Sequence, residues 1–249
     1  MQRKNILDEQ FSQLESLLEN YDDLSISLQF KLVQNIYDLG LNGQQKLLQK
    51  LIFDYFNKSD LINCIHGFIF ELLLKSTYPP IIQVVNQYFY HGIVPLKSAC
   101  NIDYLTLQQL LLKQQFQKAD HMTHLKLCEL AQIQGNHARE WLYFTDVSLL
   151  PALDLYTIDK LWSIHSRGLF GISIQRKIWL SSDSDWNKFW DKIGWKVNEL
   201  PRRYPQEFIW NLNAPPGHLP LFNQLRGVQV LSALFMHPVW NEKQKPIYL

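Results

Sequence analysis

The sequence predicts an all-α protein of two units, a helical bundle over residues 1–92 and a helical domain over residues 101–249. Apolar residues recur at intervals of three and four along most of the chain, which is the period of an amphipathic helix. The connections between these stripes are short, so neighbouring helices are expected to pack antiparallel. All 8 tryptophans lie at or after Trp141, which indicates that the two units differ in character.

Five apolar stripes predict five helices in residues 5–91. Gly40 ends the second, Ser59-Asp60 is expected to cap the fourth, and Pro79-Pro80 opens the fifth, which ends near Gly92. No strict repeat is present, so a small bundle and a short armadillo- or HEAT-like stack both remain open. A supporting role and a partner-binding role for this unit also remain open.

A linker over residues 92–103 leads to two further predicted helices. Asp103 can cap the first, which carries a run of leucines from Leu105, and the second runs from about Phe116 to Gln132. On that second helix, His121, His124 and Cys128 share a face. Zinc uses such ligands, but no fourth ligand is spaced to complete a site. Partly exposed histidines beside a core cysteine are the simpler interpretation, and no metal is expected.

The stretch from Pro151 to Trp179 is dense in aromatic residues and predicts a buried helical corner. Asp154 can cap a helix with an apolar face, and Gly168 can end it by taking a positive φ. Asp154 and Asp159 are five residues apart and so lie on different faces of the helix. Capping and solvation explain both carboxylates, and no catalytic pair is indicated.

Downstream, Asp183 or Ser184 is expected to cap a short helix that contains Trp186. A basic, proline-bounded loop follows at residues 200–205. Residues 211–221 hold three prolines and a glycine beyond Asn213, so they cannot form a regular helix and are expected to form a mobile loop. A last helix is predicted from about Leu221 to Phe235.

Two motifs in this half resemble one known family, the "genomes uncoupled" tetrapyrrole-binding proteins, which are porphyrin-binding regulators of magnesium chelatase. The first is DLYTIDKLWSIHSRGLFGISIQRKIW, ending at Trp179, and the second combines APPGHLP from Ala214 with NQLRG from Asn223. The resemblance covers about Asn101 to Trp240. The matching positions of the first motif are Asp154, Thr157, Asp159, Trp162, Ser166, Gly168, Phe170, Gly171, Ser173, Gln175 and Trp179.

The resemblance implies a tetrapyrrole-binding domain that takes protoporphyrin or magnesium protoporphyrin. It further implies a regulator, not an enzyme, that stimulates magnesium chelatase through that enzyme's large porphyrin-binding subunit. Cyanobacterial and algal members of the family carry an N-terminal helical module, as this chain does. Trp162, Phe170 and Trp179 are interpreted as scaffold residues.

A porphyrin is a flat, largely apolar disc with two carboxylates, so its site needs an aromatic concavity with basic groups at the rim. The resemblance places this site between the last helices and implies ligand contacts by Asn223 and Arg226. Gln229 stands where a second basic residue is expected, and Arg203 is a candidate to compensate for it. The loop of residues 215–220 is the expected flap. The remaining candidate contacts are Tyr204, Phe208, His218 and Leu219.

Composition sets the remaining limits. The chain is 47% hydrophobic and 19% charged, with a net charge of +1, which is typical of a folded soluble protein with no general attraction to nucleic acid. Its first ten residues resemble neither a signal peptide nor a transit peptide. No apolar run is long enough to span a membrane, although peripheral association stays possible. The plastid stroma of an alga, with the gene in the plastid, is the expected location, and a cyanobacterial cytoplasm is the alternative.

Two other functions remain open. The chain can be an interaction scaffold with a vestigial pocket, in which case the helical unit binds a protein. It can also be an enzyme acting on a hydrophobic ligand, for which His218 is the candidate titratable residue. No nucleotide-binding or hydrolase motif supports the enzyme alternative.

Overall fold

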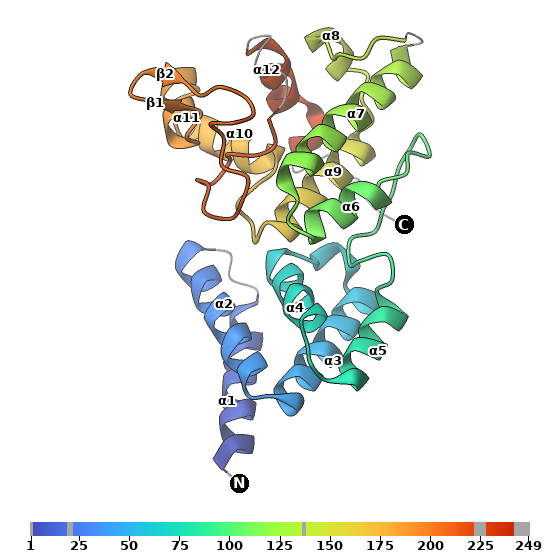
Figure 1. Ribbon diagram of the computed structural model, residues 1–249, viewed down its shortest axis with the longest axis vertical. Coiled ribbons are helices and arrows are strands. Elements are labelled where there is room, and N and C mark those ends of the chain that lie inside the picture. Colours follow the sequence, from blue (N-terminus) through green and yellow to red (C-terminus); the bar gives the residue numbers. More distant parts are fainter. Residues whose placement is uncertain (1, 19–21, 136–137, 222–227, 242–249) are drawn as a thin grey trace. The chain divides into compact units, whose positions relative to one another are not determined.

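The structure is a computed structural model that describes residues 2–18, 22–135, 138–221 and 228–241 (Figure 1). Over these residues the chain is helical except for one short two-stranded sheet, which confirms the predicted all-α class. It divides into two compact units, Met1–Ile93 and Val94–Leu249. In the described residues, no helix combines the length and the apolar character needed to cross a membrane.

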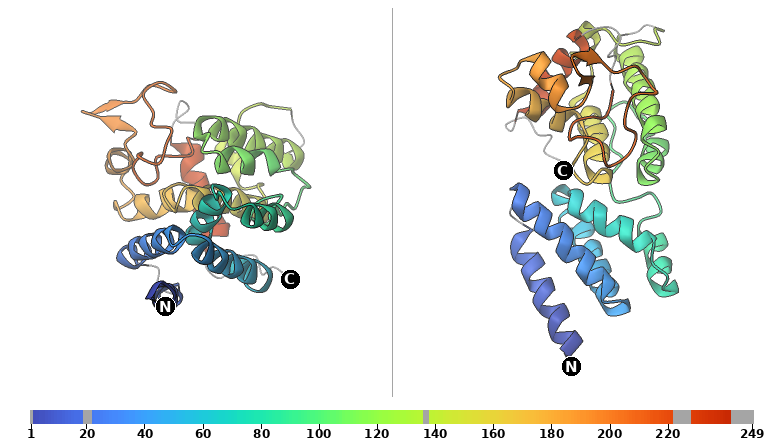
Figure 2. Two further views of the ribbon diagram at one scale, coloured as in Figure 1. Left: turned by 60° about the horizontal axis from the view of Figure 1, so that its bottom comes forward. Right: turned by 60° about the vertical axis from the view of Figure 1, so that its left-hand side comes forward.

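In the first unit α2, α3 and α5 pack on α4, and α1 packs on α2. The central helix α4 buries every residue from Ile65 to Leu73, as expected for a helix covered on all sides. Helix α2 lies between α1 and α3 in Figures 1 and 2, and it also packs on α4. The elements are α1 (Gln2–Leu17), α2 (Asp23–Asp38), α3 (Leu41–Asn57), a 3₁₀ turn (Ser59–Leu61), α4 (Cys64–Leu74) and α5 (Pro79–Tyr88).

The helix starts of this unit correct one sequence prediction. Ser59-Asp60 precedes α4 but does not cap it, because Ser59–Leu61 forms its own 3₁₀ turn. Asn63 is the N-cap instead, and its Oδ1 accepts from the backbone N–H of Ile65 at 3.0 Å. The five predicted helices are all present, and the fifth ends at Tyr88, slightly before the predicted Gly92.

The second unit contains seven α-helices in its described residues. Helix α12 packs against α8 and α10, and α9 packs against α6 and α10. The elements are α6 (Leu105–Leu112), α7 (Phe116–Gly135), α8 (Phe144–Val147), α9 (Ala152–His165), α10 (Ile172–Leu180), α11 (Trp186–Lys192), β1 (Lys196–Val197), β2 (Leu200–Pro201), α12 (Gln229–Met236) and a 3₁₀ turn (Pro238–Trp240).

A cluster of aromatic side chains holds α7, α9 and the turn before α10 together. Trp162 is fully buried, and its ring stacks on Phe116 with centroids 6.0 Å apart. Its indole Nε1 donates a hydrogen bond of 2.9 Å to Oγ1 of Thr123, so the buried donor is satisfied. Phe170 packs edge-on against Phe116 at 5.3 Å. The scaffold role predicted for Trp162 and Phe170 is therefore confirmed.

The acidic residues of α9 are buried, not solvated, so that part of the sequence interpretation was wrong. Pro151 occupies the N-cap position, and Asp154 lies inside the first turn. Oδ1 of Asp154 accepts from the hydroxyl of Tyr104 at 2.7 Å, and Oδ2 accepts from the backbone N–H of Ala99 at 2.9 Å. Oδ1 of Asp159 accepts from the backbone N–H of Ser173 at 2.8 Å. Both carboxylates therefore join α9 to other segments.

Two further predictions concern the helices near the C-terminus. Helix α11 is capped by Asp185, whose Oδ1 accepts from the N–H of Asn187 at 2.8 Å, and not by the expected Asp183 or Ser184. The last helix was predicted from about Leu221, whereas α12 begins at Gln229. Residues 222–227 lie outside the described residues.

A small hairpin precedes the proline-rich loop. Strands β1 and β2 are antiparallel, with Lys196 opposite Pro201 and Val197 opposite Leu200. The two residues between them, at positions 198 and 199, have φ values of 50° and 64°. Positive φ at both positions is the requirement of a two-residue hairpin turn whose twist matches that of the strands.

Candidate functional site

An open apolar hollow lies beside α12 in the second unit. It has a volume of about 400 Å³, and helices α8, α11 and α12 supply its walls. Small-molecule pockets typically measure roughly 300–1,000 Å³ and are mostly apolar. The hollow is lined by Phe144, Trp186, Val228, Gln229, Ser232, Ala233 and Met236.

One aromatic ring of the lining, that of Trp186, is backed by further aromatic rings. The ring of Trp186 stacks on Phe235 with centroids 5.9 Å apart and an interplanar angle of 12°. Trp179 lies 5.2 Å from Trp186 and packs on Phe235 as well. Among the described residues, Nε1 of the buried Trp179 has no hydrogen-bond partner. Rings packed in this way present a flat, rigid surface on which a planar ligand can stack.

The outer edge of the hollow exposes apolar side chains to solvent. Phe144 is 49% exposed and Met236 is 64% exposed. Exposed apolar groups that gather around a concavity mark a binding surface more often than isolated ones do. Gln229 contributes a neutral amide at the first turn of α12. The hollow therefore combines an aromatic ring, an apolar edge and two polar side chains, those of Gln229 and Ser232.

The spacing of the α12 residues in this hollow could have been found in the sequence. Gln229, Ser232, Ala233 and Met236 follow one another at i, i+3, i+4 and i+7, which places them on one helix face. Sequence reasoning assigned the leucine-rich face of this helix and named Gln229 from the resemblance, but it missed Ser232, Ala233 and Met236. Phe144 had no comparable signal, because α8 is a helix of only 4 residues.

The predicted contacts other than Asn223 and Arg226 lie around a second aromatic cluster. Phe208 is buried and lies 6.3 Å from the ring of Tyr204 and 5.3 Å from that of His218. Arg203 is exposed, and its backbone N–H donates to Oε2 of Glu207 at 2.7 Å. None of these residues lines the apolar hollow in the described part of the chain. Their contact with a ligand stays a prediction.

His218 is held by both of its ring nitrogens. Nδ1 lies 2.7 Å from the carbonyl oxygen of Ile193, and Nε2 lies 3.0 Å from the backbone N–H of Ile209. A neutral ring with its proton on Nδ1 satisfies both bonds. Burial lowers the pKa of His218, which favours this neutral form. Since neither ring nitrogen is available to a substrate, the arrangement describes a structural link and not a general base.

The proline-rich loop is pinned, which contradicts the predicted mobile flap. Nε2 of Gln175 donates to the carbonyl oxygens of Gly217 at 3.0 Å and Pro220 at 2.8 Å. The N–H of Gly171 donates to the carbonyl oxygen of Leu219 at 3.1 Å. Leu219 is fully buried. Helix α10 therefore fixes the last part of this loop.

Asp120 of α7 fixes the residue that follows the loop. Its Oδ1 accepts a hydrogen bond of 2.6 Å from the backbone N–H of Leu221. Burial raises the pKa of Asp120 to about 8, and the bond from Leu221 offsets only part of this effect. Residues 222–227, which carry the predicted contacts Asn223 and Arg226, come directly after Leu221 in sequence and lie outside the described residues.

The possible metal ligands on α7 do not form a site. Nε2 of His124 lies 3.7 Å from Sγ of the buried Cys128, and His121 is exposed. Within the described ranges no group of three or more His, Cys, Asp or Glu side chains could hold a metal ion.

The sequence matches the GUN4-like family over residues 97–238, which is more than half of the chain. The chain belongs to the GUN4-like family. This agrees with the resemblance found in the two motifs. The match contains every residue that lines the apolar hollow, so the hollow is a feature of the GUN4-like part of the chain. The whole N-terminal unit, residues 1–93, lies outside the match.

Relatives and solved structures support this membership. The protein ycf53 of Pyropia yezoensis is 54% identical over 178 residues, which cover 72% of this chain and 75% of the relative. The "Tetrapyrrole-binding protein, chloroplastic" of Arabidopsis thaliana is 41% identical over 145 residues, or 54% of each chain. The structure of GUN4 from Chlamydomonas reinhardtii matches with a TM-score of 0.54 and 38% identity, covering 59% of this chain and 96% of that one.

Proposed function

We propose that the domain predicted over residues 101–249 binds a tetrapyrrole in the apolar hollow beside α12. The observation that carries this proposal is an apolar hollow in the GUN4-like part of the chain, lined by the ring of Trp186, which stacks on Phe235 behind it. A relative that is 41% identical is named a tetrapyrrole-binding protein. One face of a porphyrin would lie against Trp186, and its edge would meet Phe144 and Met236.

The groups proposed to contact the propionates shortly precede the first α12 residues of the hollow in the sequence. Arg226 precedes the hollow residue Val228 by two positions, and Asn223 precedes it by five. An arginine can take a carboxylate through two parallel hydrogen bonds, whereas the neutral amide of Gln229 offers a weaker one. The expected result is one strongly held propionate and one that is held less tightly. Arg203 remains a candidate second partner.

The proposed ligand is protoporphyrin or its magnesium form, and the proposed role is regulatory. Bound to a tetrapyrrole, the protein would stimulate magnesium chelatase through the large porphyrin-binding subunit of that enzyme, in the plastid stroma. The name of the Arabidopsis thaliana relative describes it as chloroplastic, which supports a plastid. A binding protein can act by favouring one state of its partner, so no catalytic residue of its own is required. The occupied ring nitrogens of His218 agree with this.

Tryptophan fluorescence provides the first test, because all 8 tryptophans lie at or after Trp141. Titration with protoporphyrin and with magnesium deuteroporphyrin should give saturable quenching. The Arg226→Ala variant should bind more weakly, and the saturated protein should raise the rate of magnesium chelatase. Absence of saturable quenching would favour the alternative of an interaction scaffold with a vestigial pocket. Quenching without any effect on the chelatase would retain the ligand and reject the proposed partner.

A further inference from the structure

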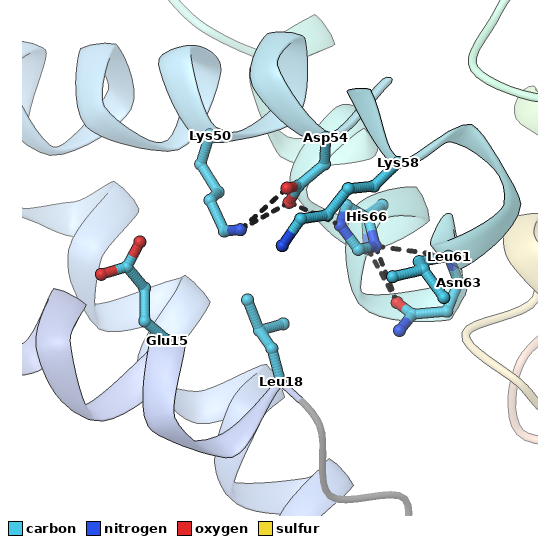
Figure 3. Close-up of a pocket in the computed structure, with 8 residues that line it drawn as sticks. All are labelled: Glu15, Leu18, Lys50, Asp54, Lys58, Leu61, Asn63 and His66. Atoms are coloured by element: carbon cyan, nitrogen blue, oxygen red, sulfur yellow. Dashed lines mark hydrogen bonds and ion pairs between the residues drawn. The ribbon is translucent and has the colours of Figure 1, made fainter. Parts of the chain in front are cut away.

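A second, polar pocket lies in the N-terminal unit. It has a volume of about 190 Å³, and Figure 3 shows its lining side chains. Since a water molecule in the liquid takes up about 30 Å³, the pocket has room for roughly six waters or one small solute. Helices α1 and α3 and the start of α4 form it. The lining residues are Glu15, Leu18, Lys50, Asp54, Lys58, Leu61, Asn63 and His66.

The floor of this pocket is a buried network around Asp54. Its side chain is 4% exposed, and its carboxylate lies 2.7 Å from Nζ of Lys50 and 3.0 Å from Nε2 of His66. Burial alone would raise the pKa of Asp54, but hydrogen bonds from His66 and Lys50 lower it below its ordinary value. The carboxylate is therefore charged, and these two donors occupy both of its oxygens. Asp54 thereby holds the ammonium group of Lys50 in one place.

The groups that remain available in the pocket are mainly hydrogen-bond donors. Lys50 has three N–H protons and one partner carboxylate. Figure 3 shows the amines of Lys50 and Lys58 directed toward the same space. Among the described residues, Lys58 has no ion-pair partner. Oδ1 of Asn63 is used as the cap of α4, which leaves the amide Nδ2 of the same side chain as a further donor.

The charges of the pocket favour an anion at its inner end. Lys50 and Asp54 neutralise each other, and Lys58 forms no ion pair with a described carboxylate, so Glu15 is the one other charge in the lining. The carboxylate of Glu15 lies on the opposite wall, on α1, and is exposed to water (Figure 3). A buried ion pair contributes little to stability compared with apolar packing, so this network is better explained by the position it gives to Lys50.

We propose that this pocket binds a small oxyanion, a carboxylate or a phosphate group, between the ammonium groups of Lys50 and Lys58. The amide of Asn63 supplies a third donor, and Leu18 and Leu61 contact the rest of the ligand. Charge-assisted hydrogen bonds to carboxylate or phosphate are the strongest that such groups form. The site is separate from the apolar hollow, so it does not depend on the proposed tetrapyrrole function.

The test is an NMR titration of the full-length ¹⁵N-labelled protein with inorganic phosphate and, separately, with acetate. Sodium chloride keeps the ionic strength constant, because exposed lysines attract any anion at low salt. Saturable shifts of the backbone N–H signals of Asn63, Ile65 and His66 are expected. Saturation by phosphate alone would assign a phosphate-bearing ligand, and saturation by both anions would assign oxyanions in general. Saturation by neither would overturn the proposal.

Three variants sharpen this test. Lys58→Met should weaken binding about tenfold, since it removes one charge-assisted partner. Lys31→Met is the matched control, because Lys31 is exposed on α2 and outside the pocket, and it should leave binding unchanged. Glu15→Gln should strengthen binding, because it removes a repelling charge. The proposal would be contradicted if the Lys58 and Lys31 variants weakened binding equally. It would also be contradicted if the Glu15 variant bound the anion more weakly than the wild type.

Discussion

Oδ1 of Asp120 accepts a hydrogen bond of 2.6 Å from the backbone N–H of Leu221, and this bond joins α7 to a residue 101 positions further along the chain. Asp120 is 5% exposed, so the bond is shielded from water. Leu221 directly precedes residues 222–227, which include the predicted ligand contacts Asn223 and Arg226. One buried side chain thus fixes the residue that precedes the segment on which the proposed propionate contacts lie.

Replacing Asp120 by alanine should lower both stability and tetrapyrrole affinity. The variant leaves the buried N–H of Leu221 without an acceptor, which costs about 1–3 kcal/mol of unfolding free energy. Asp120→Asn keeps an acceptor of the same shape and should lose much less. Urea unfolding and fluorescence titration measure the two effects. If alanine and asparagine behave alike, the hydrogen bond to Leu221 is not what makes Asp120 important.

The free energy of unfolding should fall as the pH rises, because two aspartates are buried. Burial raises the pKa of Asp120 to about 8 and that of Asp159 to about 6, both above the ordinary value of 3.8. The folded protein therefore binds more protons than the unfolded chain between pH 4 and these values. This contribution to stability is complete below about pH 4 and is lost as the pH rises toward 8.

Asp120→Asn isolates this effect, because asparagine does not titrate. Unfolding free energies measured by urea from pH 5 to pH 9 should fall with pH more steeply for the wild type than for the variant. His218 and His237 have lowered pKa values because of burial, so they act in the opposite direction in both proteins and cancel in the comparison. Parallel curves for the two proteins would show that Asp120 does not titrate in this range.

Restoring a basic residue at position 229 should tighten porphyrin binding. Gln229→Arg places a guanidinium at the edge of the hollow, and one added charge-assisted hydrogen bond corresponds to about a tenfold gain in affinity. The positive charge near the N-terminus of α12 should cost about 0.3–1 kcal/mol of stability. Gln109→Arg, an equal change at an exposed position of α6, is the control for non-specific attraction. A similar gain in both variants would count against a propionate site beside Gln229.

A charge on the apolar edge of the hollow should weaken binding without unfolding the protein. Met236 is 64% exposed, so Met236→Glu should change the stability little, yet it would repel a propionate and disrupt the apolar contact. Leu180→Glu, at a residue of α10 that is 46% exposed, is the matched control. Fluorescence titration should show weaker porphyrin binding for the Met236 variant alone. Unchanged affinity in that variant would move the ligand away from the hollow.

His218→Ala should act as a stability mutation. It removes two buried hydrogen bonds and leaves space between Ile193 and Ile209, at a cost of roughly 2–4 kcal/mol. Chemical unfolding measures this cost directly. A variant as stable as the wild type would reopen the alternative in which His218 serves a catalytic function.

Much of the helical pattern could be predicted because it depends on near neighbours. The apolar stripes of the first unit follow from the spacing of side chains a few residues apart. The capping residues could not be predicted in the same way, because several candidates lie close together before α4 and before α11. Only the backbone conformation distinguishes Asn63 from Ser59 and Asp185 from Asp183.

The sequence by itself determined the all-α class, the positions of most helices and the membership of the family. The first two depend on the spacing of apolar residues close together in the chain, and the third depends on two motifs. Only the tertiary structure decided that Asp154 and Asp120 are buried, that residues 217–221 are pinned and that the apolar hollow lies beside α12. The physical reason is distance along the chain. The partner of Asp154 lies 50 residues away, at Tyr104, and that of Asp120 lies 101 residues away, at Leu221, so packing alone brings them together.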